Sequence, residues 1–219
     1  MKFDILTLFP DIIHNYSAVS ILGRGQKAGV IKIKAHDFRE WTLSKQRHVD
    51  DSPYGGGAGM VLQVKPIYRC LESLGLVKNG KKIKNKKTKV IIMDPAGKKF
   101  DQRMAEKFSK LDNLVIIAGR YEGFDERIYK FVDEKISVGD YVLAGGELPA
   151  LTIVEATSRL IPGVLGNEES LKEETFGKEK FIEYPQYTRP EDFMGLKVPK
   201  ILLSGDHKKI AEWRRKHQN

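Results

Sequence analysis

Short runs of apolar residues recur along the first two thirds of the chain. Segments 3–8 and 30–35, the second with alternating lysines, are typical of strands. Segments 90–93 and 114–117 are near-continuous apolar runs, which are typical of central strands in a parallel sheet. A further short strand is expected at about 135–137.

Two segments with helical spacing lie between these runs, at 64–74 and 101–111. Asp101 stands where a helix N-cap is expected. An alternation of strand, helix and strand predicts an α/β domain built on a parallel sheet.

Three stretches depart from this pattern. Residues 44–59 are polar and end in glycines, and residues 78–89 contain seven lysines and no acid. Residues 167–190 are acidic at first and lack clear periodicity. We expect this third stretch to lead into a short C-terminal part that ends in a helix at 210–216.

The composition of the 219 residues favours a protein with a packed core. The low cysteine content suits a reducing compartment. Hydrophobic residues make up 41% and charged residues 31% of the chain. A single cysteine, Cys70, excludes an intrachain disulfide and a cysteine-rich zinc site. No apolar run has the length that spans a bilayer, and Asp4 interrupts the first one, which argues against a signal peptide. We therefore expect a cytoplasmic protein with no membrane partner.

The net charge of +9 favours a polyanionic partner such as nucleic acid. Common catalytic motifs are missing: the glycines at 55–59 lack the spacing of a dinucleotide-binding turn, and there is no Walker-type phosphate loop. The five histidines show no metal-like spacing, and there is no nucleophile elbow. Dehydrogenase, nucleotide triphosphatase, zinc protease and α/β-hydrolase functions are disfavoured.

Three glycine-bearing loops, at 94–97, 119–123 and 138–146, each follow a predicted strand. In open α/β sheets, ligands bind just beyond the carboxyl ends of the strands. Glycine there lets the backbone approach a ligand closely, and Tyr141 and Leu143 could wall an adenine ring. Each loop alone is more simply a tight turn. Together they predict a shared pocket.

Five segments of the sequence resemble those of a known family, and two of these segments contain the loops at 119–123 and 138–146. They are PYGGGAGM (53–60), GRYEGFDER (119–127), VGDYVLAGGELPAL (138–151), SRLIPGVLGNEES (158–170) and YPQYTRP (184–190). In this order, and over nearly the whole chain, they resemble the bacterial tRNA (guanine-N(1))-methyltransferase family, TrmD.

The resemblance implies an α/β fold of the SPOUT type, a parallel sheet with a deep trefoil knot, followed by a small helical C-terminal domain. The implied parts are a methyltransferase domain at 1–165, a linker at 166–173 and a tRNA-binding domain at 174–219. The family usually continues beyond this length with another basic helical stretch. Residues 78–89 are a candidate replacement for its tRNA contacts, although a lysine run is usually a solvated loop. An obligate homodimer with a shared active site is also implied.

The implied reaction transfers a methyl group from S-adenosylmethionine to N(1) of the guanosine next to the anticodon, tRNA position 37. Carried over to this chain, the cofactor-binding residues are Pro95, Gly97, Gly119, Tyr121, Glu122, Gly123, Val138, Gly139, Asp140, Tyr141, Val142, Leu143, Gly145, Gly146 and Pro149. The RNA-binding residues are Asp50, Tyr54, Gly55, Gly56, Gly57, Gly59 and Ser170.

Methylation at N(1) of neutral guanine requires a base for its proton and a positive group for the neighbouring oxygen. The family has an arginine before IPGVLG and an aspartate after it. The arginine corresponds to Arg159, for which an ion pair with Glu155 one helical turn earlier is an equal alternative. The aspartate position holds Glu174, within an acidic run that is by default solvated. Glu122 and Glu174 are the candidate ligands for the Mg²⁺ that the resemblance implies.

Two alternatives stay open. One is another SPOUT methyltransferase, acting on ribosomal RNA or on a ribose hydroxyl, which the segments at 158–170 and 184–190 disfavour. The other is an RNA-binding homologue without catalysis, which only Glu174 and the short C-terminal part favour.

Overall fold

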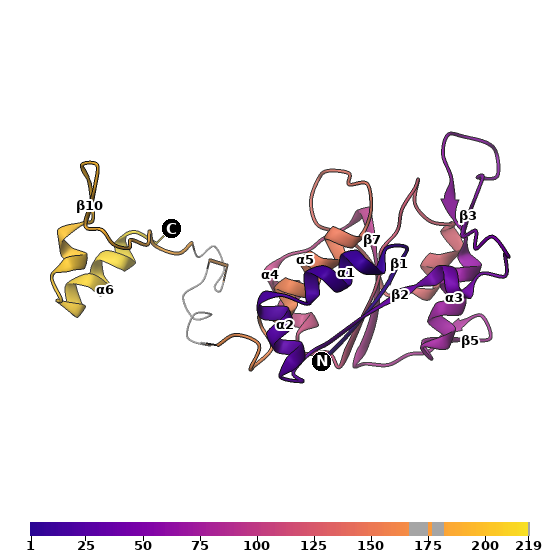
Figure 1. Cartoon of the computed structure of the whole chain (residues 1–219), viewed down its shortest axis with the longest axis horizontal. Coiled ribbons are helices and arrows are strands. Elements are labelled where there is room, and N and C mark those ends of the chain that lie inside the picture. The colour runs from indigo at the N-terminus through magenta and orange to yellow at the C-terminus, as the bar shows by residue number, and fades with distance from the viewer. Residues whose placement is uncertain (167–174, 177–181, 219) are drawn as a thin grey trace. The chain divides into compact units, whose positions relative to one another are not determined.

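The structure is a computed structural model of the chain (Figure 1). It describes residues 1–166, 175–176 and 182–218. The chain divides into two compact units, Met1–Gly166 and Asn167–Asn219, which are described separately. The predicted base, Glu174, and the predicted RNA contact, Ser170, lie outside the described residues.

A five-stranded sheet with every neighbouring pair parallel forms the centre of the first unit. The strand order is β2-β1-β8-β7-β9. The strands are β1 (Lys2–Thr7), β2 (Lys32–Asp37), β7 (Thr88–Lys99), β8 (Asn113–Ile117) and β9 (Glu134–Ser137). The α/β class and the parallel sheet are therefore confirmed. The knot stays a prediction.

Helices cover both faces of this sheet (Figure 1). One face packs against α1 (Pro10–Ser17), α2 (Ser20–Lys27), α4 (Gln102–Phe108) and α5 (Glu147–Ser158). The other packs against α3 (Val64–Ser73) and the 3-10 helices η1 (Phe38–Trp41) and η2 (Glu126–Phe131).

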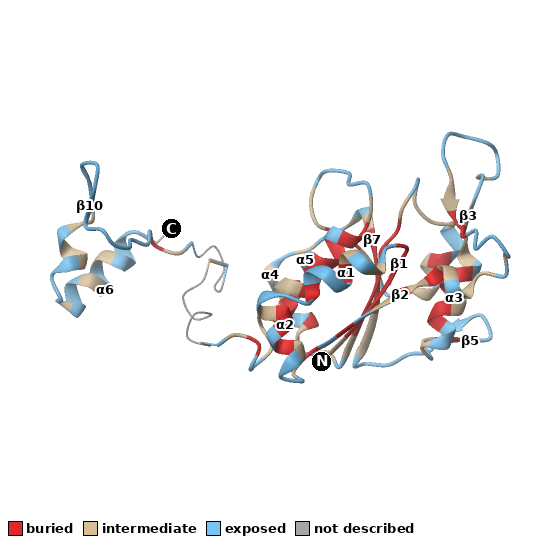
Figure 2. Ribbon diagram, in the orientation of Figure 1, coloured by how far each residue is buried: buried red, intermediate tan, exposed pale blue. Residues whose placement is uncertain are grey.

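The central strands contribute alternate residues to the two cores. In β7, Ile91 and Met93 face the α5 side, whereas Val90 and Ile92 face α3. Both sets are buried, as the red strands in Figure 2 show. This explains why these strands are near-continuous apolar runs rather than alternating ones.

Strand β7 corrects one prediction. The loop at 94–97 does not end the strand, because β7 continues to Lys99 with an irregularity between Met93 and Lys98, both of which pair with Ile136. The Asp94 carboxylate accepts a hydrogen bond from the amide of Ala96 at 2.8 Å, which turns the chain locally without releasing it from β9.

The predicted cap of α4 is confirmed, since the Asp101 carboxylate accepts a hydrogen bond from the amide of Met104 at 2.8 Å. In the second unit, the helix predicted at 210–216 is present as part of α6 (His207–Lys216). This unit also contains η4 (Lys200–Leu203) and the short strands β10 (Asp192–Phe193) and β11 (Leu196–Lys197). Among the described residues, no helix is both long and apolar enough to cross a membrane.

Candidate functional site

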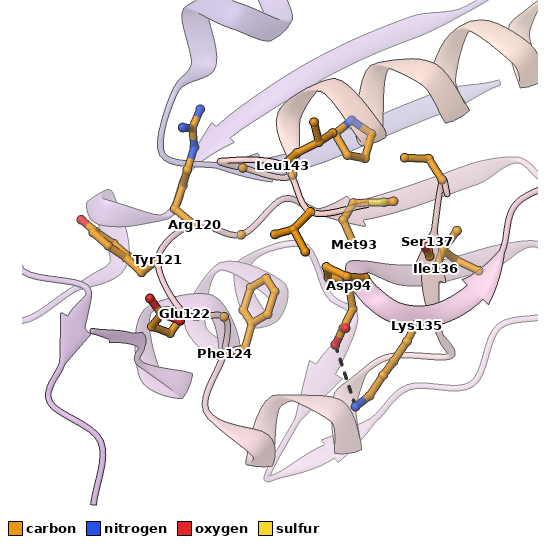
Figure 3. A pocket seen from close by; sticks show the side chains of 18 of the residues that line it. Met93, Asp94, Arg120, Tyr121, Glu122, Phe124, Lys135, Ile136, Ser137 and Leu143 are labelled. Carbon is orange, nitrogen blue, oxygen red and sulfur yellow. Dashed lines mark ion pairs between the residues drawn. The ribbon is translucent and has the colours of Figure 1, made fainter. Parts of the chain in front are cut away.

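The three glycine-bearing loops meet around one pocket at the carboxyl ends of β8 and β9 and at the irregularity within β7 (Figure 3). Its volume is about 440 Å³, which is in the range of small-molecule sites. The predicted convergence is confirmed, and it follows from the strand order, because β7 lies between β8 and β9 and its irregularity is level with the ends of those two strands.

Close backbone contact joins two of the loops. The amide of Gly146 donates a hydrogen bond to the carbonyl of Gly119 at 2.8 Å. A Cβ atom at Gly146 would lie 2.8 Å from Cα of Ala118, closer than real Cβ atoms approach. Only glycine lets the start of α5 press against the end of β8, and this contact closes one side of the pocket.

Most of the predicted cofactor residues line this pocket. The exceptions are Gly97, Gly139 and Asp140. Gly97 packs against the backbone of Ile136, and Asp140 forms an ion pair with Lys99. These three lie within the pocket loops without facing the cavity.

The list of predicted cofactor residues left out several lining residues, which come from strands, from η2 and the segment before it, and from within two of the predicted loops. They are Met93, Asp94, Phe124, Glu126, Tyr129, Lys135, Ile136, Ser137 and Ala144. No motif or glycine marks them individually. Their place within or near the predicted loops along the chain is the signal that could have found them.

A polar cluster on one wall is built around Asp94. Its carboxylate accepts a hydrogen bond from the Tyr129 hydroxyl at 2.6 Å, and Nζ of Lys135 lies 3.9 Å away (Figure 3). Burial, and then the hydrogen bond to Asp94, raise the pKa of Tyr129. The Tyr129 phenol therefore stays protonated and acts as a donor at neutral pH.

Two further carboxylates of the pocket, Glu122 and Glu126, are exposed. Neither side chain forms a hydrogen bond or an ion pair with another described residue. In a chain of net charge +9, two uncompensated carboxylates in one pocket favour a ligand that carries positive charge.

A buried carboxylate fixes the arginine of this site. Glu147 is 1% exposed, and it accepts hydrogen bonds from the Thr7 hydroxyl at 2.7 Å and from Nε of Arg120 at 2.9 Å. Glu147 lies in the first turn of α5, where the helix dipole stabilises negative charge. The guanidinium of Arg120 lies 4.5 Å from the ring centroid of Phe9. The sequence signal for this role is a lone acid at the start of an apolar helix.

The predicted RNA-binding loop is anchored to the pocket. Strands β3 (Asp50–Asp51) and β4 (Val61–Leu62) flank it. The amide of Glu122 donates to the carbonyl of Met60 at 3.0 Å. Gly59 has a φ of +79°, and a Cβ atom there would lie 2.4 Å from Cγ of Glu122. The other predicted residues of the loop are exposed: Tyr54, Gly55, Gly56 and Gly57.

Arg159 lies outside the pocket. It follows α5 as its C-cap and lines a separate hollow of about 370 Å³ together with Tyr16, Leu148, Leu151, Thr152, Glu155 and Ala156. Glu155 accepts a hydrogen bond from the Tyr16 hydroxyl. Within the described part of the chain, no group of three or more His, Cys, Asp and Glu side chains is placed to hold a metal ion.

Comparison with known proteins adds the decisive observation. The family model described as tRNA (Guanine-1)-methyltransferase TrmD matches residues 1–219. The chain belongs to this family. Three relatives carry the name tRNA (guanine-N(1)-)-methyltransferase. The protein of Lactobacillus johnsonii is 52% identical over 216 residues, which cover 99% of this chain and 85% of the relative.

The second relative, from Citrifermentans bemidjiense, is 51% identical over 219 residues, covering 100% of this chain and 85% of its own length. The third, from Dictyoglomus turgidum, is 48% identical over 216 residues, with 99% and 84% covered. Membership of the TrmD family confirms the resemblance drawn from the motifs. Two of those TrmD-like segments, GRYEG (119–123) and VGDYVLAGG (138–146), supply much of the pocket wall.

Proposed function

We propose that this protein transfers a methyl group from S-adenosylmethionine to N(1) of a guanosine in tRNA, at position 37 next to the anticodon. The observation that supports the proposal is the pocket at the ends of β8 and β9 and at the irregularity in β7, which is lined by the TrmD-like loop segments of a chain that belongs to this family. The names of the relatives support the same reaction.

The residues of the pocket fit the proposed cofactor. Met93, Ile136, Val138 and Leu143 offer apolar surface for an adenine ring, and the loop backbones offer hydrogen bonds. Glu122 and Glu126 match the positive charge of a sulfonium and an ammonium group. When bound, the cofactor supplies an electrophilic methyl group.

The chain must remove the proton from N(1) as the nitrogen accepts the methyl group. We assign the proton to the carboxylate of Glu174, by the family's spacing from Gly166. We assign Arg159 to the guanine oxygen, where negative charge develops as the proton leaves. The products are the N(1)-methylated guanosine and the demethylated cofactor.

The position of Arg159 supports a site shared between two chains. Its hollow is separate from the pocket, and Tyr16 and Leu148, which line that hollow, are 46% and 60% exposed. Exposed apolar side chains around a hollow are suited to contact with another protein surface. We therefore propose a homodimer in which Arg159 of one subunit serves the pocket of its partner.

We propose that Mg²⁺, if the reaction uses it, is bound by the carboxylates of Glu122 and Glu174. A largely hydrated ion held by one or two carboxylates is usual for this metal, so the lack of a three-residue cluster among the described residues does not conflict with it. We also propose that this chain has the two further features that the TrmD resemblance implies, a deep trefoil knot and a C-terminal domain that binds tRNA.

The test is mass spectrometry of tRNA incubated with the protein and S-adenosylmethionine. We expect one added methyl group on N(1) of the guanosine at position 37. Methylation of a ribose or of ribosomal RNA alone would instead indicate the other SPOUT activity. Binding of tRNA without any methylation would indicate a homologue that has lost catalysis.

A further inference from the structure

A basic surface extends from the glycine-rich loop between β3 and β4 (52–60), along α3, to a lysine-rich hairpin at 77–82. Residues 64–89 contain nine lysines and arginines and a single acid, Glu72. We call this surface the basic track. It consists of Lys65 and Arg69 on α3 and of the exposed lysines at 78–87.

The lysines of the track stand on a fixed support. Strands β5 (Val77–Lys78) and β6 (Lys81–Lys82) form an antiparallel hairpin, and the amide of Gly80 donates a hydrogen bond to the Tyr68 hydroxyl at 2.9 Å. Val77 is buried in the core beneath α3. A simple solvated loop would have neither attachment.

The lysines of this segment fall into two groups. Lys82 pairs with Asp133 and Lys89 with Glu134, so these two hold the segment to the domain. The others are exposed and form no ion pair with any carboxylate of the described residues. They are Lys78, Lys81, Lys84, Lys86 and Lys87. Five uncompensated charges so close together repel one another, and a polyanion relieves that repulsion.

The α3 end of the track adds an aromatic hollow. Tyr68 and Phe131 meet edge to face with ring centroids 4.9 Å apart. They help to line a hollow of about 270 Å³, and Lys65, Arg69 and Arg127 stand around it. An apolar aromatic floor with cations at its rim suits a nucleotide, since a base stacks on aromatic rings and its phosphate attracts the cations.

The track leads away from the proposed active site. Helix α3 begins directly after β4, which flanks the glycine-rich loop, and ends before β5, as Figure 1 shows. Its ten residues span about 15 Å. Arg127, which stands at the hollow, pairs with Asp125 on the segment that leads from the pocket into η2.

We propose that the basic track binds the sugar-phosphate backbone of the tRNA beyond the nucleotide that enters the pocket. This proposal rests on the proposed function for the identity of the RNA. Its surface is independent of the pocket, because none of the track residues lines it.

The test measures tRNA binding by the full-length protein at a series of KCl concentrations. The variant Lys81→Gln/Lys84→Gln/Lys86→Gln should bind about tenfold more weakly at low salt. Its slope of log K against log [KCl] should be shallower by about 2, because each lost phosphate contact contributes about 0.7–0.9. Lys65→Gln/Arg69→Gln should also flatten the slope. Affinity for S-adenosylmethionine should stay unchanged.

The matched control is Arg24→Gln/Lys27→Gln/Lys32→Gln, which removes three exposed charges from α2 and β2. It should leave the slope unchanged. Equal flattening in the control and in the hairpin variant would overturn the track, and so would an effect in only one of its two parts. If the wild-type protein methylates tRNA while the track variants bind tRNA normally, the proposal that the track binds tRNA is wrong and the proposed function stands. If the wild type does not methylate tRNA, the proposed function fails.

Discussion

Asp4 is a charged residue in the middle of the sheet, and three donors surround it. The side chain is fully buried and accepts from Lys2 at 2.7 Å, from His36 at 2.8 Å and from Asn113 at 3.0 Å. Burial alone would raise the pKa of Asp4, but these hydrogen bonds outweigh it and hold the pKa below its usual value. Asp4 therefore stabilises the fold as a carboxylate.

We predict that Asp4→Asn lowers the free energy of unfolding by about 3 kcal/mol at pH 7, because asparagine has no negative charge to pair with Lys2 and replaces one of the two acceptor oxygens with an NH2 donor. The folded pKa of Asp4 lies below the unfolded value of about 3.9. Its contribution is thus complete above about pH 4 and is lost as the pH falls through the folded pKa. Urea unfolding of both proteins should show the difference narrowing with acid. A difference that is constant with pH, or equal to that of the exposed control Asp112→Asn, would contradict the prediction.

Glu174 is assigned as the catalytic base only by its spacing from Gly166, which matches the position of the family's aspartate. We predict that Glu174→Gln lowers single-turnover methyl transfer by about 10²-fold or more, since it keeps the size and removes the base. Cofactor affinity should barely change, and Glu174→Asp should retain much of the activity. Glu173→Gln is the control for the register. If that control loses activity while Glu174→Gln does not, the base is the neighbouring residue.

Among the elements, those with a clear period were predictable. Apolar runs identified the strands now labelled β7 and β8, and helical spacing identified α3 and α4. Helix α5 lacks such a period, because eight of its twelve residues are buried and apolar side chains occur on most of its circumference. No prediction was made for α1 and α2, which are only eight residues each. Short helices of this kind depend on tertiary packing more than on their own pattern.

The parts of the site that could be predicted from the sequence are the loops that contain glycines. Loops at 119–123 and 138–146 were identified from their glycines and their place after strands, and both line the pocket. The contact between Asp94 and Tyr129 was not predicted, since it depends on how β7 and η2 approach each other in space. The same holds for Glu147 and its contact with Thr7, which is 140 residues away in sequence.

The glycine-rich loop gives a prediction at the scale of the element. Gly59→Ala should lower methyl transfer to tRNA by about tenfold, because the new Cβ collides with the side chain of Glu122, which lines the pocket and must then leave its position. Positive φ should also cost about 1 kcal/mol of stability. Gly29→Ala is the matched control, with a φ of +72° and nothing within 4 Å. Steady-state kinetics and thermal unfolding of the two variants separate the effects: both should lose stability, and only Gly59→Ala should lose activity. Equal activity in the two would show that the loop does not shape the site.

At the scale of the whole molecule, we propose that two chains build each active site. The cofactor residues gather in one pocket, whereas Arg159 lines another hollow beside the exposed side chains of Tyr16 and Leu148. In the proposed dimer, two-fold symmetry makes the contact reciprocal, so that each Arg159 serves the pocket of the partner subunit. We predict a dimer in sedimentation at micromolar concentration, and a monomer there would remove this explanation.

Mixed dimers test whether the site itself is shared. Leu143→Trp should block the pocket, because Leu143 lines it from a loop where it is 42% exposed and a larger ring can enter without disturbing the core. Arg159→Ala should leave the pocket intact and remove the partner's contribution. If each active site combines the pocket of one subunit with Arg159 of the other, a mixed dimer of the two inactive variants has one complete site. Unfolding and refolding the variants together should then restore about a quarter of the wild-type methyl transfer, as expected for random pairing. If each site is built within one chain, every site in the mixture carries a defect, and activity should stay at the level of the separate variants.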